Sequence, residues 1–291
     1  MSRGYITIAQ NSGDLDYVRM AYALAASIKK TQSEVDEFAI IVDPNYEMPE
    51  EYKWAFDYII PMPWGDMAEG KDWKINNKWK YYHVTPFDET VVLDCDMLFT
   101  RDISHWWDLL ASKDVWACTQ VRTYRNDIAT STYYRKVFVE NKLPNVYTAF
   151  FYFKKPNKTA EELFKMAEYI TDNRSTFYNK YLDTSVPSFL SMDVVFALAM
   201  KICDLTDECI DESLHLPTFV HMKGKLQNHP NVGEKWHEFL DGQYIDNQIY
   251  VNQFRQNYPF HYVQKEWLTD TIIKQIAVSY THLRAHETIQ H

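Results

Sequence analysis

Apolar and polar positions alternate along the first part of the chain in a strand, helix, strand order. Residues 4–12 begin with an apolar run and end in a polar turn, and residues 37–43 form a run too continuously apolar for a half-exposed strand. Between them, residues 14–30 repeat apolar side chains at helical spacing. The stripe consists of Tyr17, Met20, Ala21, Leu24 and Ile28. This order predicts a parallel sheet covered by helices on both faces.

The same kind of pattern continues to residue 228. Residues 48–63 are predicted to form a helix and then a short strand. Further strands are predicted over residues 85–96, 114–121, 145–155 and 217–228, and further helices over residues 72–84, 159–173 and 191–202. Thr159 is expected to open the second of these helices. Because no internal repeat or linker occurs, we predict a single α/β domain over residues 1–277, with a mostly parallel, Rossmann-like sheet and an extended C-terminal part.

Composition narrows the functional classes. Of the 291 residues, 46% are hydrophobic and 16% are aromatic, which is ample material for a core. The net charge is −10 and the chain has no long run of Lys or Arg, which argues against a nucleic-acid partner. This acidity fits a protein that holds an anionic ligand through a metal cation.

The cysteine and hydropathy patterns predict a cytoplasmic protein. The four cysteines form no C-x-x-C pair and match no zinc spacing, so reduced thiols are expected. Residues 1–12 contain no apolar stretch long enough for a signal peptide. No apolar run approaches the roughly 18 residues that a membrane helix requires, so we expect no transmembrane segment.

The last residues do not read as part of the natural protein. Residues 278–288, VSYTHLRAHET, resemble the translation of a transposon adapter used in sequencing libraries. We therefore exclude residues 278–291 from the predicted fold and function. His282 and His286 have the spacing of a helical metal pair, and under this interpretation the spacing is accidental.

Two aspartates one residue apart interrupt an apolar run. Asp94 and Asp96 follow directly after residues 91–93, at the carboxyl end of a predicted buried strand, where open α/β sheets bind ligands. Side chains at i and i+2 of a strand point to the same side, so both carboxylates can reach one ion. Asp14 and Asp16 have the same spacing but mark a helix start. The alternative for Asp94 and Asp96 is a pair of solvated carboxylates at a turn.

The segment around these aspartates resembles the metal-binding segment of nucleotide-sugar glycosyltransferases of the glycogenin and bacterial lipooligosaccharide galactosyltransferase type. The similarity lies in residues 91–110, VVLDCDMLFTRDISHWWDLL, where an apolar strand, Asp-x-Asp, an Arg-Asp pair and Trp follow one another. Residues 6–28, 37–43 and 220–226 resemble this family's first strand and helix, its second strand and its late His-x-x-Gly signature. The resemblance extends over most of residues 4–227 and implies a GT-A fold.

The resemblance also implies a metal and a donor. Asp94, Asp96 and His221 would hold Mn²⁺, with Mg²⁺ as the alternative, and the ion would bridge the phosphates of a nucleotide-diphosphate sugar. Two carboxylates and an imidazole suit Mn²⁺ better than Mg²⁺, because imidazole is a softer ligand than oxygen. We expect a UDP-sugar donor, transfer of a hexose with retention, and an acceptor that is a glycan, a lipid-linked glycan or a protein. A satisfied core histidine is the alternative for His221.

Two groups of residues match the donor-binding positions of this family. Ala9, Gln10 and Asn11 match the turn that meets the nucleotide, and Asp43 ends the second strand near the expected base. Ordinary turn residues are the alternative for Gln10 and Asp43.

The second group is expected to surround the diphosphate. Lys78 lies on the predicted helix before the motif, where the family has a basic residue that touches the donor, and Lys80 competes for this role. Cys95 lies between the two aspartates within the donor-binding segment. Gly224 and Lys225 follow His221, and Lys225, like Lys223, can form charge-assisted hydrogen bonds to phosphate. Lys225 is a substitute for a lysine that the family has two residues later.

Asp193 is the expected catalytic carboxylate. Relatives carry a cluster of acidic and amide residues here, beside the donor sugar, whereas this chain has Ser191 and Met192 before Asp193. The alternative is an aspartate at a helix start that accepts hydrogen bonds from backbone N–H groups. This departure from the family pattern leaves the retaining outcome without sequence support.

Two other functions compete with sugar transfer. A sugar nucleotidyltransferase would carry a Gly-rich phosphate loop near its N-terminus, and this chain has seven glycines in all and no such loop. A non-catalytic binder of nucleotide sugars or carbohydrates can share the fold, since fold does not fix function. Trp64, Trp73, Trp106 and Trp107 can stack on a sugar ring or can belong to the core.

The interpretation of the tail can be tested by deletion. Removal of residues 278–291 is expected to leave the melting temperature unchanged, because an adapter-derived segment contributes no packing. Differential scanning calorimetry of the full and shortened chains measures this directly. A loss of several degrees would show that the tail packs against the protein.

Overall fold

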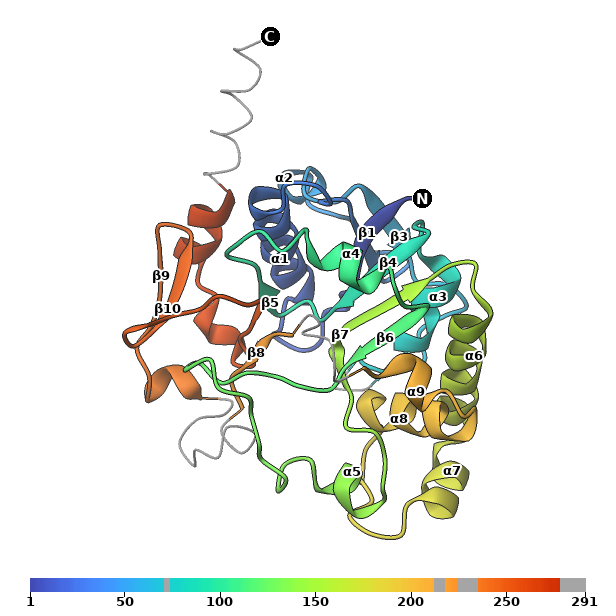
Figure 1. The fold of residues 1–291 in the computed structure, drawn as a ribbon. Coiled ribbons are helices and arrows are strands. Elements are labelled where there is room, and N and C mark those ends of the chain that lie inside the picture. Colours follow the sequence, from blue (N-terminus) through green and yellow to red (C-terminus); the bar gives the residue numbers. More distant parts are fainter. Residues whose placement is uncertain (71–73, 212–217, 224–234, 278–291) are drawn as a thin grey trace.

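The computed structural model describes residues 1–70, 74–211, 218–223 and 235–277. Within these residues a central six-stranded sheet has the order β3-β2-β1-β4-β7-β6 (Figure 1). β1 pairs in parallel with both β2 and β4, and β2 pairs in parallel with β3. β7 is antiparallel to β4 and to β6, so the sheet is mainly parallel and the α/β prediction is confirmed. The strands are β1 (Arg3–Ile8), β2 (Phe38–Val42), β3 (Tyr58–Pro61), β4 (Glu89–Leu93), β6 (Val115–Cys118) and β7 (Tyr147–Lys154).

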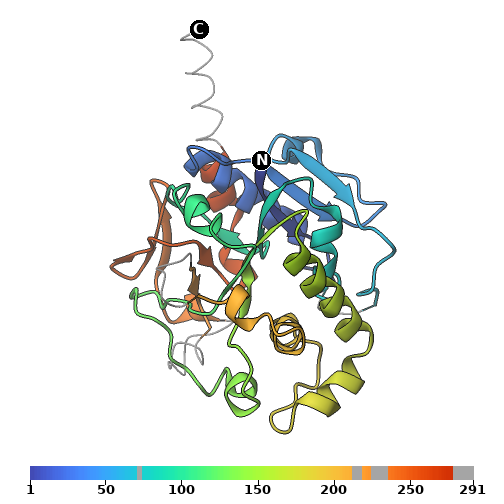
Figure 2. The ribbon, with the colours of Figure 1, turned by 45° about the vertical axis from the view of Figure 1, so that its right-hand side comes forward.

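Helices cover both faces of this sheet (Figures 1 and 2). α1 and α4 pack on one face, against side chains such as Tyr5 of β1. α3, α6 and α8 pack on the other face, against the next residue of the same strand, Ile6. This alternation follows from the two-residue period of a strand. The helices are α1 (Tyr17–Thr31), α2 (Glu50–Lys53), η1 (Lys78–Lys80), α3 (Tyr81–Val84), α4 (Trp106–Leu110), α5 (Lys136–Glu140), α6 (Lys158–Asp172), α7 (Arg174–Tyr181), α8 (Met192–Ile202) and α9 (Thr206–Cys209).

The C-terminal part returns to the N-terminal half through a second, smaller sheet. β5 (Met97–Leu98), β12 (Phe260–His261) and β8 (Val220–His221) form this sheet in the order β5-β12-β8. A third sheet consists of β9 (Gly242–Ile245), β10 (Gln248–Val251) and β11 (Phe254–Arg255), beyond β5 and α1 in Figure 1. Short 3-10 turns, η2 (Trp236–Glu238) and η3 (Lys265–Trp267), bring tryptophans into the same apolar cluster as α1.

Side-chain caps mark the starts of α1 and α6. Asp16 accepts a hydrogen bond from the backbone N–H of Arg19 at 2.9 Å and caps α1. At α6 the cap is Asn157, whose side chain accepts from the N–H of Ala160 at 3.0 Å, so the prediction that Thr159 opens this helix is wrong. Asn is among the strongest capping residues, and it stands two positions before Thr159.

The predicted helix over residues 72–84 is shorter than expected. Helical structure begins only at η1 and continues as α3, and residues 71–73 lie outside the described part. None of the four cysteines is in a disulfide, and all four are described. In the described part of the chain, no helix combines the length and apolarity needed to cross a bilayer.

Candidate metal and donor-binding site

The two aspartates lie where the chain passes from the central sheet to the small one. Asp94 follows the last residue of β4, and its N–H donates to the carbonyl oxygen of Ala149 in β7 at 3.1 Å. Asp96 immediately precedes β5, and its carbonyl oxygen accepts from the N–H of Tyr262 at 3.2 Å. Backbone hydrogen bonds therefore fix the aspartate segment at both ends, at the carboxyl end of a parallel strand.

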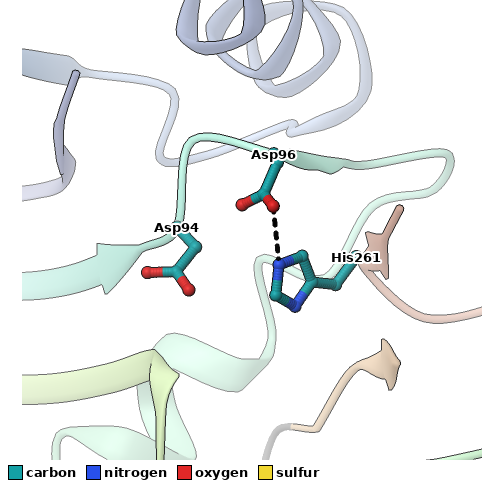
Figure 3. A group of neighbouring side chains, drawn as sticks. All are labelled: Asp94, Asp96 and His261. Atoms are coloured by element: carbon teal, nitrogen blue, oxygen red, sulfur yellow. Dashed lines mark ion pairs between the residues drawn. The ribbon is translucent and has the colours of Figure 1, made fainter. Parts of the chain in front are cut away.

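A histidine from the C-terminal part completes the group. β12 pairs antiparallel with β5 so that His261 is opposite Met97, next to Asp96 in the chain. His261 Nε2 lies 3.0 Å from Asp96 Oδ2 (Figure 3). Ligand atoms of Asp94, Asp96 and His261 all lie within 4.8 Å of one another. Two carboxylates and one imidazole thus converge from two distant segments of the chain.

His221, the histidine expected from the sequence, occupies the neighbouring strand. β8 pairs in parallel with β12, with His221 in register with His261, and the two ring centroids are 4.7 Å apart. Burial, followed by the charges of His261 and Lys223, lowers the pKa of His221 well below its usual range, so this imidazole is neutral. Among the described residues, the converging group includes His261 rather than His221. The assignment of His221 as a ligand therefore stays a prediction.

Sequence reasoning missed His261 and had little means to find it. His261 stands between Phe260 and Tyr262, so it has the same appearance as His221, a single histidine in an apolar strand. Only the pairing of β12 with β5 places it beside Asp96.

Each carboxylate also meets an ammonium group. Lys78 of η1 forms an ion pair with Asp94, and Lys265 of η3 forms one with Asp96. Burial alone would lower the pKa of Lys78, but Asp94 and then Tyr81 outweigh it and raise the pKa. Burial alone would raise the pKa of Asp96, whereas His261 and Lys265 together lower it well below its usual range. Asp96 is therefore ionised, as a metal ligand must be.

These residues fit a divalent cation. The side chains of Asp96 and His261 are only 10% and 9% exposed, and their site combines hard oxygen ligands with one imidazole. Within the described residues, the buried His261 Nδ1 has no hydrogen-bond partner. A cation bound here would compete with Lys78 and Lys265 for the carboxylate oxygens of Asp94 and Asp96.

Side-chain hydrogen bonds join the turn after β1 to the end of β2 and to the segment before η1. Gln10 donates to Asp43 Oδ1 at 2.6 Å, and Asn77 Nδ2 donates to Gln10 Oε1 at 2.8 Å. Asn77 also donates to Asp66 Oδ1 at 2.6 Å, which ties the loop before η1 to the same turn. Side-chain donors led by Asn77 lower the pKa of Asp66 to about 2 against the opposing effect of burial. Gln10 and Asp43 thus lie together, as a shared role at the base would require.

The other expected donor-binding residues occupy different environments. The N–H of Ala9 donates to the carbonyl oxygen of Ile41 at 2.9 Å, and Asn11 Oδ1 accepts from the N–H of Val18 at the start of α1. Cys95 packs its side chain into the apolar cluster. Lys80 is fully buried and donates to the carbonyl oxygens of Pro63 and Gly65, whereas Lys78 faces Asp94. Gly224 and Lys225 lie outside the described residues.

Asp193 is held by a network of its own. It is the second residue of α8, and its Oδ1 accepts from Thr148 N–H at 2.9 Å and from Thr148 Oγ1 at 2.8 Å. Arg135 Nη1 lies 2.7 Å from its Oδ2. The guanidinium also donates to Asn145 and lies 3.9 Å from the ring centroid of Tyr147. Arg135 and Thr148 overcome the effect of burial and lower the pKa of Asp193.

Comparisons with known proteins find glycosyltransferases of distant likeness. No protein-family model and no curated protein sequence matches the chain. Among solved structures, the glycosyltransferase GlyE of Streptococcus pneumoniae has a TM-score of 0.40 and 10% identity over 72% of this chain, which spans 45% of GlyE. Mouse xyloside xylosyltransferase 1 has a TM-score of 0.44 and 9% identity, covering 71% of this chain and 84% of its own. The galactosyltransferase LgtC, in complex with donor and acceptor sugar analogues, has a TM-score of 0.42 and 13% identity, covering 67% and 70%. At this level of similarity, the activity has to be argued from the site itself.

The pairing of Arg135 with Asp193 generates a stability prediction. Arg135→Met leaves the carboxylate without its cation, and because Asp193 is 24% exposed we expect a loss near the low end of the range for broken buried pairs, about 3 kcal/mol. Arg135→Met combined with Asp193→Asn should cost less than the sum of the single changes, since it removes the stranded charge. Urea unfolding measures each variant.

The same pair sets a pH dependence with a defined sign. The folded-state pKa of Asp193 lies below its unfolded value, so its stabilisation is complete above about pH 4 and is lost as the pH falls through the folded value. Asp193→Asn should flatten this acid slope. Arg122→Met, which removes a guanidinium stacked 4.7 Å from the Tyr258 ring, is the matched control. For the stability prediction, the loss in unfolding free energy of the double variant is compared with the sum of the two single losses. Equality of the two values would contradict an energetic coupling between Arg135 and Asp193.

Proposed function

We propose that this protein is a metal-dependent glycosyltransferase that moves a hexose from a nucleotide-diphosphate sugar, with UDP as the expected nucleotide, to a glycan, lipid-linked glycan or protein acceptor. The observation that supports this most directly is the convergence of Asp94, Asp96 and His261 at the carboxyl end of a parallel strand. Lys78 and Lys265, which pair with the same carboxylates, are cations that can also bind an anionic ligand.

A cation at this site would be held by Asp94, Asp96 and His261, with His221 as the neighbouring alternative. When bound, Mn²⁺ supplies Lewis-acid neutralisation of the charge that develops on a departing diphosphate. Lys78 and Lys265 bind the same phosphates by charge-assisted hydrogen bonds once they leave the carboxylates. The buried setting strengthens each of these interactions relative to water.

The nucleoside part of the donor would lie along the first turn. Gln10, Asp43 and Asn77 offer amide and carboxylate groups that are already joined by hydrogen bonds of 2.6 and 2.8 Å. Such preorganised polar groups can exchange one partner for a base or ribose at small entropic cost. Asn11, the neighbour of Gln10 in the chain, accepts a hydrogen bond from the N–H of Val18 in the first turn of α1. This turn therefore lies beside a helix N-terminus, which favours an anionic ligand.

A second candidate function is binding of a nucleotide sugar without transfer. The observation that favours it is the environment of Asp193, whose two carboxylate oxygens already receive hydrogen bonds from Thr148 and Arg135. These hydrogen bonds give Asp193 a structural role that explains its position without any part in catalysis. The catalytic role of Asp193 therefore stays a prediction.

The metal site can be tested by ligand-dependent thermal shift. UDP with Mn²⁺ should raise the melting temperature by several degrees, since a ligand at a hundredfold excess over its Kd stabilises the native state by about 2.7 kcal/mol. Asp96→Ala should abolish the Mn²⁺-dependent part of the shift. GDP and CMP, each with and without Mn²⁺, test the choice of base.

The two histidines provide a matched comparison. His261→Ala should reduce the Mn²⁺-dependent shift as Asp96→Ala does, whereas His221→Ala should reduce it less if His261 is the third ligand. The opposite ranking would assign the metal to His221 and return His261 to a role in orienting Asp96. A shift with UDP that is equal with and without Mn²⁺ would contradict the metal-dependent proposal as a whole.

Asp193→Asn separates transfer from binding. Asn retains the volume and part of the hydrogen bonding, so Mn²⁺–UDP affinity should stay near that of the unaltered protein. If the charge stabilises the transition state, hydrolysis of UDP-hexose or transfer of the hexose should fall roughly a hundredfold or more. Near-normal turnover in this variant would give Asp193 a purely structural role.

A further inference from the structure

An exposed tryptophan lies in the loop that precedes η1. Trp64 is 67% exposed, whereas Trp106 and Trp107 are buried in the core. Its ring is stacked nearly parallel to that of Trp79, with an interplanar angle of 3° and a centroid distance of 5.8 Å. The ring of His83 stands edge-on to it at 5.2 Å. The contacts with Trp79 and His83 thus fix the plane of an indole that is mostly exposed to solvent.

The backbone at Trp64 is held in an unfavourable conformation. Its φ angle is +55°, a region that bulky residues rarely occupy, and Gly65 follows with φ of +77°. Strained backbone persists only where the surroundings enforce it, and such positions are concentrated at functional sites. The groups around Trp64 therefore hold the loop in this conformation.

Lys80 imposes this orientation. Its side chain is fully buried, and its ammonium donates to the carbonyl oxygens of Pro63 and Gly65, on the two sides of Trp64. Burial lowers the pKa of this lysine, so enclosing its charge carries a cost. The same cation lies 5.6 Å from the ring centroid of Trp79. A buried lysine that fixes the two carbonyls around one exposed residue indicates that the position of this residue matters.

η1 connects this loop to the candidate site. Its three consecutive residues make three separate contacts: Lys78 pairs with Asp94, Trp79 stacks on Trp64, and Lys80 holds the loop carbonyls. The Trp64 ring is therefore anchored on the same turn that positions a site lysine. Its own exposed face makes no contribution to the metal group.

Charged groups on α6 and before it lie near the tryptophan stack. Glu161 and Lys165 of α6 form an ion pair, and together with Lys155 they lie close enough to His83 to influence its pKa, which burial lowers. A flat aromatic face with charged groups beside it matches the chemistry of a pyranose, whose C–H face packs on an aromatic ring while its hydroxyls bond to polar side chains.

We propose that Trp64, which is not among the residues of the metal group, is a stacking subsite for a pyranose ring. The proposal rests on the proposed function in one respect, namely that the protein handles sugars. The ring can belong to the acceptor glycan or to the donor hexose, and both present the same C–H face to the indole.

The experiment measures binding of uncharged oligosaccharides. Maltohexaose, cellohexaose, xylohexaose and lactose are titrated against the protein, with saturation-transfer difference NMR and intrinsic tryptophan fluorescence as readouts. Trp64→Ala should weaken the binding of at least one of them by tenfold or more. Tyr169→Ala, which removes an aromatic side chain of similar exposure, 57%, from α6, is the matched control and should leave binding unchanged. Because Trp64 is on the surface, its removal is expected to leave the fold intact, as circular dichroism checks.

UDP with Mn²⁺ is measured on the same samples, so that failure of this proposal and failure of the proposed function can be told apart. Trp64→Ala should leave the UDP shift unchanged. A loss restricted to free oligosaccharides places the acceptor glycan on Trp64, and a loss restricted to UDP-glucose or UDP-galactose relative to UDP places the donor hexose there. Equal sugar binding with and without Trp64, or no saturable binding of any of these sugars, would overturn the proposal. Self-association that disappears in Trp64→Ala, without sugar binding, would overturn it as well.

Discussion

The cost of enclosing two carboxylates at the end of an apolar strand dominates this structure. Asp94 and Asp96 leave β4 among buried side chains, and an ionised carboxylate in such surroundings is costly unless a cation or donors compensate it. The compensating groups come from two other segments of the chain: Lys78 lies shortly before the strand, whereas His261 and Lys265 belong to the C-terminal part, Lys265 being 169 residues after Asp96. The C-terminal part is thereby bound electrostatically to the N-terminal half as well as by packing.

Asp193 presents the same physical problem with a different solution. Its carboxylate is satisfied within the protein by Arg135 and Thr148, and Arg135 is itself held between the rings of Phe138 and Tyr147, each 3.9 Å from the guanidinium carbon. Rigid partners of this kind are not easily displaced. The lysines at Asp94 and Asp96 are flexible point charges, which makes them exchangeable for a metal ion and able to follow an anionic ligand. The contrast between an exchangeable and a fixed pair distinguishes the proposed binding group from the surrounding framework.

A further buried charge lies beside the loop around Trp64. Lys80 is enclosed two residues after Lys78, yet it meets backbone carbonyls instead of a carboxylate. Successive residues of η1 thus serve the site, the aromatic stack and the loop conformation in turn. The 3-10 geometry helps, because three residues per turn direct neighbouring side chains to well-separated directions. The short turn η1 therefore contacts both the Asp94 carboxylate and the exposed loop around Trp64.

Local pattern was sufficient for much of this protein. The alternation of apolar runs and helical stripes predicted the mainly parallel sheet with helices on both faces, because side-chain periodicity reflects burial directly. The position of Asp94 and Asp96 directly after an apolar run predicted that they lie at the carboxyl end of a buried strand, and β4 does end at Leu93, because such a position depends on consecutive residues alone. The tertiary structure alone decided that His261 meets Asp96, that Lys265 joins them, and that Lys80 is buried while Lys78 faces the site. These outcomes depend on the pairing of β12 with β5 and on the direction of each turn. Such long-range contacts leave no periodic signal in the sequence, because many segments of similar composition could have formed them.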